Sequence, residues 1–161
     1  NKPYVEDVTL INKKTMSYVI QLSHIVINTK NREKTLSQDN KTDLFKYIWG
    51  IVTNKNCRLY RINGIENHIH MLIGIHQSIS LMELVREIKR SSSIWIKQSG
   101  NSPKFDGWSK EYAAFSVSWE AKDSVINYIK NQEEHHRVIS FDDEYKSILQ
   151  QHEINEYISP Q

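Results

Sequence analysis

The run NHIHMLIGI at residues 67–75 constrains the fold more than any other part of this chain. Side chains alternate between the two faces of a β-strand, so the large apolar residues at every second position from 69 to 75 share one face. Such a face belongs to a hydrophobic core. The other face carries His68 and His70, and we expect these histidines to project from an uncovered side of the sheet.

The rest of the chain alternates between strand and helix patterns. We predict strands over 17–28, 57–63, 67–75 and 112–118, and helices over 40–55, from Ser80 onward, over about 120–136 and over about 141–152. Asn63-Gly64 is typical of a hairpin turn, Ser80 and Glu83 form a capping box, and Ser140 is a plausible helix cap. This order predicts an α+β fold of the ferredoxin-like, split βαβ kind, an antiparallel sheet with helices on one face plus C-terminal helices. Residues 1–15 have no clear period, and we expect a loosely ordered extension before a single domain over 16–161.

Charge is unevenly distributed, although the formal net charge is only +2. Residues 30–61 carry eight Lys or Arg against three Asp or Glu, and residues 133–161 carry seven acidic against two basic residues. A basic region of this kind permits contact with a phosphate backbone, but charge alone favours the simpler explanation of two solvated faces. The single cysteine, Cys57, cannot form an internal disulfide. With no apolar run near the ~20 residues of a membrane span, we expect a cytoplasmic protein with no membrane partner.

Two short clusters carry residues of chemical interest. His68 and His70 are two residues apart on a rigid strand, so both imidazoles can bind one metal ion; the alternative is a pair of surface histidines. Tyr128 and Gln132 are four apart on a predicted helix and therefore share a face. A phenol beside a cation can act as a nucleophile, and the Gln132 carbonyl is a neutral oxygen ligand. For a lone tyrosine, the alternative is ordinary packing at the edge of a core.

The two clusters occur together with several longer motifs. These are INGIENHIHMLIGI, SISLMELVREIKRSSSIWI, EYAAFSVS and VINYIKNQEEHH. In this order they resemble the single-tyrosine His-hydrophobe-His transposases of small bacterial insertion sequences, from about Ser17 to about Ile154. One departure is Ala113, where relatives often have glycine before the AFS stretch.

The resemblance implies a role for each matching residue. His68, His70 and Gln132 would bind one divalent ion, Mg²⁺ or Mn²⁺, within a catalytic domain over 16–161. Tyr128 would attack the scissile phosphate of single-stranded DNA, join to its 5′ end and free a 3′-hydroxyl. Hairpin ends of the DNA and a homodimer of edge-joined sheets are implied as well, with Tyr128 acting in its own subunit or across the interface. No nucleotide cofactor is needed, in keeping with the lack of a Gly-rich phosphate-binding loop.

Basic and aromatic residues outside these motifs are candidates for DNA contact. The basic candidates are Lys55, Arg58, Arg61, Arg86, Lys89, Arg90 and Lys97. Trp108 and Tyr112 are candidates for stacking on unpaired bases, whereas core packing is the expected role of Trp95. Among the other histidines, His24 is expected to be structural or a neighbour of the site. His135 and His136 are adjacent on a helix, point about 100° apart and are not expected to bind one ion together.

Two other functions fit the same sequence. One alternative is a domesticated protein that binds DNA hairpins without moving an element, although the intact His, Tyr and Gln set argues against lost chemistry. A non-enzymatic ferredoxin-like dimer that binds a small ligand would make the histidines incidental. A metal titration and a cleavage assay on a hairpin substrate separate all three functions.

Overall fold

A computed structural model of the chain describes residues 17–154. The extension predicted over 1–15 lies outside the described residues. Four antiparallel strands form one sheet in the order β2-β3-β1-β4: β1 (Leu22–Asn28), β2 (Arg58–Ile65), β3 (His68–Gly74) and β4 (Ala113–Val117). The predicted split βαβ arrangement is confirmed, because helices α1 (Lys41–Asn54) and α2 (Leu81–Ser99) connect β1 to β2 and β3 to β4.

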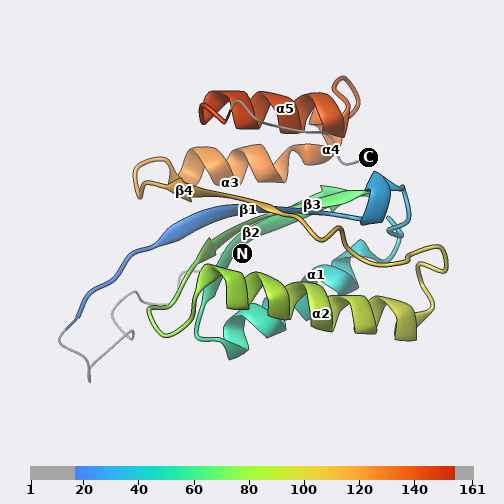
Figure 1. Ribbon diagram of the computed structural model, residues 1–161, viewed down its shortest axis with the longest axis horizontal. Coiled ribbons are helices and arrows are strands. Elements are labelled where there is room, and N and C mark those ends of the chain that lie inside the picture. The colour runs from blue at the N-terminus through green and yellow to red at the C-terminus, as the bar shows by residue number, and fades with distance from the viewer. Residues whose placement is uncertain (1–16, 155–161) are drawn as a thin grey trace, which may run out of the picture.

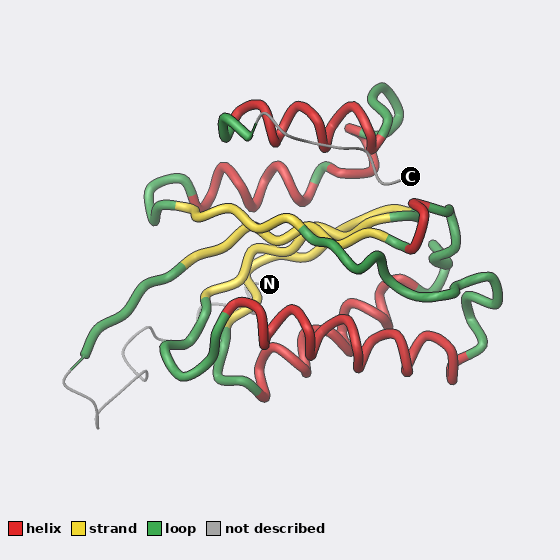
Figure 2. Tube along the Cα trace, in the orientation of Figure 1, coloured by secondary structure: helices red, strands yellow, loops and turns green. Residues whose placement is uncertain are grey.

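Helices cover both faces of the sheet (Figure 1). Helices α1 and α2 pack on one face, where the apolar side of β3 meets the main core around Ile48, Met71 and Ile88. On the other face lie α3 (Lys122–Lys130), α4 (Gln132–His135) and α5 (Phe141–Gln151). Figure 2 shows the strands as a layer between these two sets of helices. The expectation that the histidine face is uncovered is therefore wrong, because the C-terminal helices pack over it.

The predicted position of the hairpin turn is also wrong. Asn63 and Gly64 lie inside β2, where they pair with His70 and Ile69, and the turn falls at residues 66 and 67. Gly64 is required here because the strands approach very closely: a Cβ on this residue would lie 2.2 Å from the carbonyl oxygen of His68. The glycine thus marks a close approach of two backbones, which is its other common role in strands.

Helix ends follow the sequence closely, with one exception. The Ser80–Glu83 capping box is present, and the Ser140 side chain accepts a hydrogen bond from the Asp143 backbone N–H at 3.2 Å. The helix predicted over 120–136 is interrupted at Asn131, so Tyr128 and Gln132 lie on successive helices. Among residues 17–154, no helix combines the length and hydrophobicity that crossing a bilayer requires.

Candidate active site

His68 and His70 project from β3 toward α3 and α5, and both side chains are fully buried. Hydrogen bonds fix their rings. The Nδ1 of His68 lies 2.8 Å from Asn67 Oδ1, and the Nδ1 of His70 lies 2.8 Å from His24 Nε2. With Nδ1 protonated in both rings, each Nε2 keeps a free lone pair, which is the form that binds a metal. The role expected of His24, as a neighbour of the site, is confirmed by this contact.

Burial keeps these histidines neutral. Burial is the largest influence on both rings, and repulsion from neighbouring histidines adds to it: from His70 on His68, and from His136 and His135 on His70. The pKa of His68 and that of His70 therefore lie below the usual value. The same effects lower the pKa of His24 to about 3. Neutral imidazoles at neutral pH are suited to bind a cation.

Glu144, in the first turn of α5, joins the cluster although it was not among the predicted site residues. Its carboxylate is only 3% exposed. Oε2 lies 3.6 Å from His68 Nε2, 3.5 Å from His70 Nε2 and 2.8 Å from His136 Nε2. Burial alone would raise the pKa of this carboxyl group, but the hydrogen bond from His136 and the electrostatic influence of the neighbouring His70 hold it well below its usual range. Glu144 is therefore a buried carboxylate anion.

His136 lies in the same cluster and His135 does not, in keeping with the expectation that this adjacent pair does not bind one ion together. Burial opposes its charged form, but the hydrogen bond to Glu144 and the negative charge of that residue outweigh it and raise the pKa of His136. His135 is more distant, with Nε2 3.5 Å from Glu144 Oε1. The two adjacent rings do diverge, and only His136 has a ligand atom within the cluster of four.

The cluster fits a divalent cation. Ligand atoms of His68, His70, His136 and Glu144 all lie within 4.8 Å of one another. In the described part of the chain, His70 Nε2 is buried without a hydrogen bond of good geometry, 3.5 Å from Glu144 Oε2. A buried polar atom without a partner is costly, and one that faces a buried carboxylate within this group of ligand atoms suits a bound cation. One carboxylate and three imidazoles form a donor set that transition metals and Mn²⁺ accept.

Tyr128 and Gln132 contact the cluster through Glu144. The Tyr128 hydroxyl donates to Glu144 Oε1, and Gln132 Nε2 donates to the same oxygen at 3.0 Å. Gln132 Oε1 lies 3.2 Å from His68 Nε2, so a carbonyl oxygen faces the cluster as well. Burial and then the Glu144 charge raise the pKa of Tyr128 above its usual range, so the group is a neutral phenol. The structure thus brings together all four residues predicted from the two motifs.

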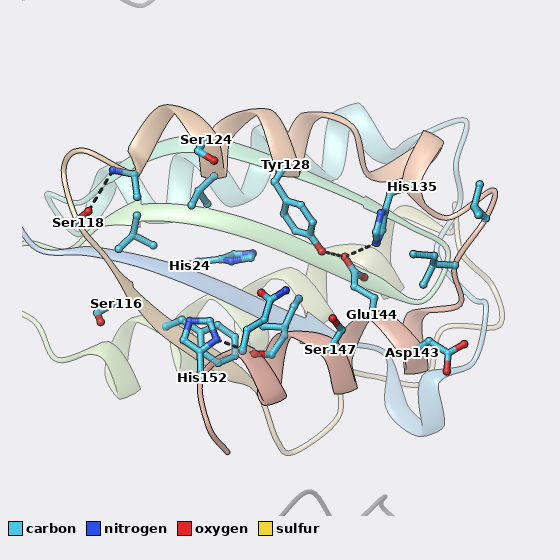
Figure 3. A pocket seen from close by; sticks show the side chains of 18 residues that line it. His24, Ser116, Ser118, Ser124, Tyr128, His135, Asp143, Glu144, Ser147 and His152 are labelled. Atoms are coloured by element: carbon cyan, nitrogen blue, oxygen red, sulfur yellow. Dashed lines mark hydrogen bonds and ion pairs between the residues drawn. The ribbon is translucent and has the colours of Figure 1, made fainter. Parts of the chain in front are cut away.

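A groove of about 820 Å³ connects this cluster to the surface. Its walls are α3 and α5, and its floor includes His24 and Phe115 from β1 and β4. Figure 3 shows Tyr128 and His135 directed toward Glu144 inside it, with serines along its length. Tyr128 is half-buried in its wall, and a ligand that entered the groove would meet the phenol.

The predicted DNA-contact residues divide between the two faces. Those in α2 and at the C-terminal end of α1 are on the face opposite the site: Lys55, Arg86, Lys89, Arg90 and Lys97. Among them, Lys89 donates to the Lys110 carbonyl at 2.8 Å, and Arg90 pairs with Glu87 at 3.2 Å. Arg58 and Arg61 belong to β2, the strand beside α3. Trp108 donates to Ser92, and Trp95 stacks on Tyr47 at 5.3 Å, as core packing predicts for Trp95.

Sequence signals for the two missed residues did exist. Glu144 is an acidic residue within the apolar stripe of α5 that contains Phe141, Tyr145 and Ile148. A charge in such a stripe is rarely buried without a partner. His136 follows Gln132 by four residues, the spacing of neighbours on one helix face.

Together, the fold and the site define a ferredoxin-like α+β domain in which a groove tyrosine adjoins a buried His–Glu cluster. The chain belongs to the family described as "Transposase IS200 like", whose model matches residues 17–132. The family resemblance inferred from the motifs is confirmed. No match was found among curated protein sequences.

Two solved structures share the fold. One is a protein of Deinococcus radiodurans R1 assigned as a transposase: TM-score 0.59, 20% identity, covering 76% of this chain and 98% of that one. The other is a REP-associated tyrosine transposase bound to a REP hairpin: TM-score 0.57, 14% identity, covering 78% of this chain and 74% of that one.

Proposed function

We propose that this transposase cleaves and rejoins single-stranded DNA at hairpin ends through a covalent 5′-phosphotyrosine at Tyr128. The observation that carries the proposal is the convergence of the Tyr128 hydroxyl with a buried cluster suited to a cation, at the inner end of an open groove. Family membership supports DNA as the substrate. The hairpin-bound tyrosine transposase of the same fold supports hairpin ends.

His68, His70, Glu144 and His136 would hold the ion, with Gln132 as a further oxygen ligand. A bound Mg²⁺ or Mn²⁺ supplies a positive charge that polarises a phosphate oxygen and stabilises charge in the transition state. Asn67 and His24 orient the two strand histidines, so removal of either partner would weaken metal binding without removing a ligand.

Tyr128 supplies the nucleophile. Its oxygen forms a bond to phosphorus while the bond from phosphorus to the 3′-oxygen breaks, which leaves a 3′-hydroxyl after protonation. The phenolic proton has an acceptor in place, since the hydroxyl already donates to Glu144. Attack of a 3′-hydroxyl on the phosphotyrosine reverses these bonds and reseals the strand. Each step exchanges one phosphoester for another, so no nucleotide is consumed.

The groove supports a preference for unpaired DNA. Tyr128 and the cluster lie in a groove between α3 and α5. A single strand is narrower and more flexible than a duplex and therefore enters such a groove more readily. We expect hairpin DNA with an unpaired flank to be cleaved, and fully duplex DNA of the same sequence to be left intact. Equal cleavage of both forms at moderate salt would contradict the proposal.

The decisive experiment is Tyr128→Phe, which removes only the phenolic oxygen. The variant should form no covalent adduct with a labelled hairpin oligonucleotide on a denaturing gel, while its binding to the same hairpin stays nearly intact. Ser147→Ala, a change in the opposite wall of the groove, is the matched control and should retain the adduct. An adduct in denatured Tyr128→Phe protein would assign the nucleophile elsewhere.

We also propose a homodimer joined at a sheet edge, since β2 and β4 are edge strands in the described chain. Tyr128 adjoins the histidines of its own subunit here, with ring centroids of Tyr128 and His70 5.8 Å apart. Mixing inactive His68→Ala protein with inactive Tyr128→Phe protein tests the arrangement. Recovery of the adduct after subunit exchange indicates action across the interface, and no recovery with exchange confirmed indicates action within one subunit.

A further inference from the structure

A partly exposed cluster of aromatic and basic side chains lies at the start of α3. It consists of Arg58, Tyr60, Trp119 and Lys122, and we refer to it as the mouth cluster. Lys122 Nζ lies 4.0 Å from the ring centroid of Trp119 and 5.6 Å from that of Tyr60. The guanidinium of Arg58 lies 4.8 Å from the Tyr60 ring. The tryptophan remains 43% exposed, so part of its ring surface is open to solvent.

The mouth cluster adjoins the groove that contains Tyr128. Ser118 and Ala121, which line the groove, are immediate chain neighbours of Trp119 and Lys122. From Lys122 to Tyr128 the helix advances six residues, or roughly 9 Å at 1.5 Å per residue. A nucleic acid strand advances about 3.4 Å per stacked nucleotide and more when extended. The cluster is therefore about one to three nucleotides from the scissile phosphate.

We propose that the mouth cluster binds the substrate strand beside the cleavage site, with an unpaired base on Trp119 and a neighbouring phosphate between Lys122 and Arg58. The inference rests on the proposed function, because it takes single-stranded DNA as the ligand. Its chemistry is general: every base has a flat π-face that stacks on an aromatic ring, and two cations attract the backbone. The Tyr60 ring makes an edge-to-face contact with the Trp119 ring, with an angle of 80° between the two ring planes. This contact limits the orientations of the indole and so favours one position for stacking. The cluster contributes affinity and position without reading sequence.

The test is equilibrium binding of a labelled single strand to the full chain in EDTA, which prevents metal-dependent cleavage. Trp119→Ala should weaken binding about 5- to 150-fold, the range for one stacked base. Trp119→Phe should restore most of the affinity, because it keeps a stacking surface. Lys122→Ala should weaken binding and reduce the salt dependence by about 0.7 in log–log slope, the value for one phosphate contact on single strands.

Trp49→Ala is the matched control. This tryptophan is 50% exposed on α1, on the opposite face of the sheet, and its loss should leave binding unchanged. An abasic scan locates the contact: wild type should lose affinity at a position about one to three nucleotides from the cleavage site, and Trp119→Ala should not. Circular dichroism and Mn²⁺ affinity verify that the variant is folded.

Unchanged binding by Trp119→Ala, or equal losses for Trp119→Ala and Trp49→Ala, would overturn the inference while single-strand binding by wild type still stands. Failure of wild type to bind single strands at all would instead contradict the proposed function. The two failures are therefore distinguishable in one experiment.

Discussion

Gly64→Ala should lower the free energy of unfolding of this protein more than an alanine substitution at any other glycine in the sheet. The added Cβ would lie 2.2 Å from the His68 carbonyl oxygen and 2.9 Å from the Ile69 Cα, both backbone atoms that cannot rotate away. Ordinary contact begins at 3.4 Å, so β2 and β3 would have to separate by about 1.2 Å at this point. Overpacking of this kind costs about 1–3 kcal/mol, and two weakened backbone hydrogen bonds add about 1 kcal/mol each.

We therefore expect a loss of about 3–5 kcal/mol in the free energy of unfolding, a large share of the 5–15 kcal/mol typical of a domain. Urea unfolding followed by circular dichroism measures it. Mn²⁺ affinity should fall as well, because Gly64 pairs with Ile69, the residue between the two strand histidines.

Gly50→Ala provides a control of opposite sign. Gly50 is inside α1, and a new Cβ there would meet no atom within 4 Å beyond its chain neighbours and the adjacent backbone of its own helix. Alanine is favoured over glycine in a helix by about 0.5–1 kcal/mol. The Gly50 variant should be more stable than wild type. A Gly64→Ala protein within about 1 kcal/mol of wild type would refute the reasoning, since the strands would then separate at little cost.

Three further predictions concern the cluster. His68→Ala or His70→Ala should weaken Mn²⁺ binding by well over tenfold in calorimetry and remove cleavage; full activity of either variant, or of wild type in EDTA, contradicts the metal assignment. Glu144→Gln, which keeps the size of the side chain and removes its charge, should weaken Mn²⁺ binding at least about tenfold, and unchanged affinity would place Glu144 outside the ligand set. In EDTA, the free energy of unfolding should decrease as the pH is lowered. The His24 pKa is about 3 in the folded protein and 6.5 in the unfolded chain, so the unfolded chain takes up the proton first. Stability is then full above pH 6.5 and falls by about 2 kcal/mol from this residue by pH 5; a His24→Gln protein with the same pH slope in urea would contradict it.

Local sequence patterns predicted the elements and one part of the site. The alternation in NHIHMLIGI determines which side chains share a face of β3, because the period of a strand is two. It therefore predicted directly that His68 and His70 project from the same face. The Ser80–Glu83 capping box and the Ser140 cap are likewise local, since each satisfies backbone groups within one turn. Tyr128 and Gln132 were identified from their motif and resemblance, and both lie at the cluster.

Only the tertiary structure decided what covers the histidines. Glu144 is 74 residues beyond His70 in the chain, and its contact depends on how α5 packs over the sheet, which no local period specifies. The same holds for Gly64: Asn-Gly favours a turn locally, but the hydrophobic register of β2 against β3 places it inside a strand. The sequence alone predicted that β3 is a strand, that its two histidines share a face, and that Tyr128 belongs to the site. The complete His–Glu cluster and the groove beside it exist only because α3, α4 and α5 pack together on one face of the sheet.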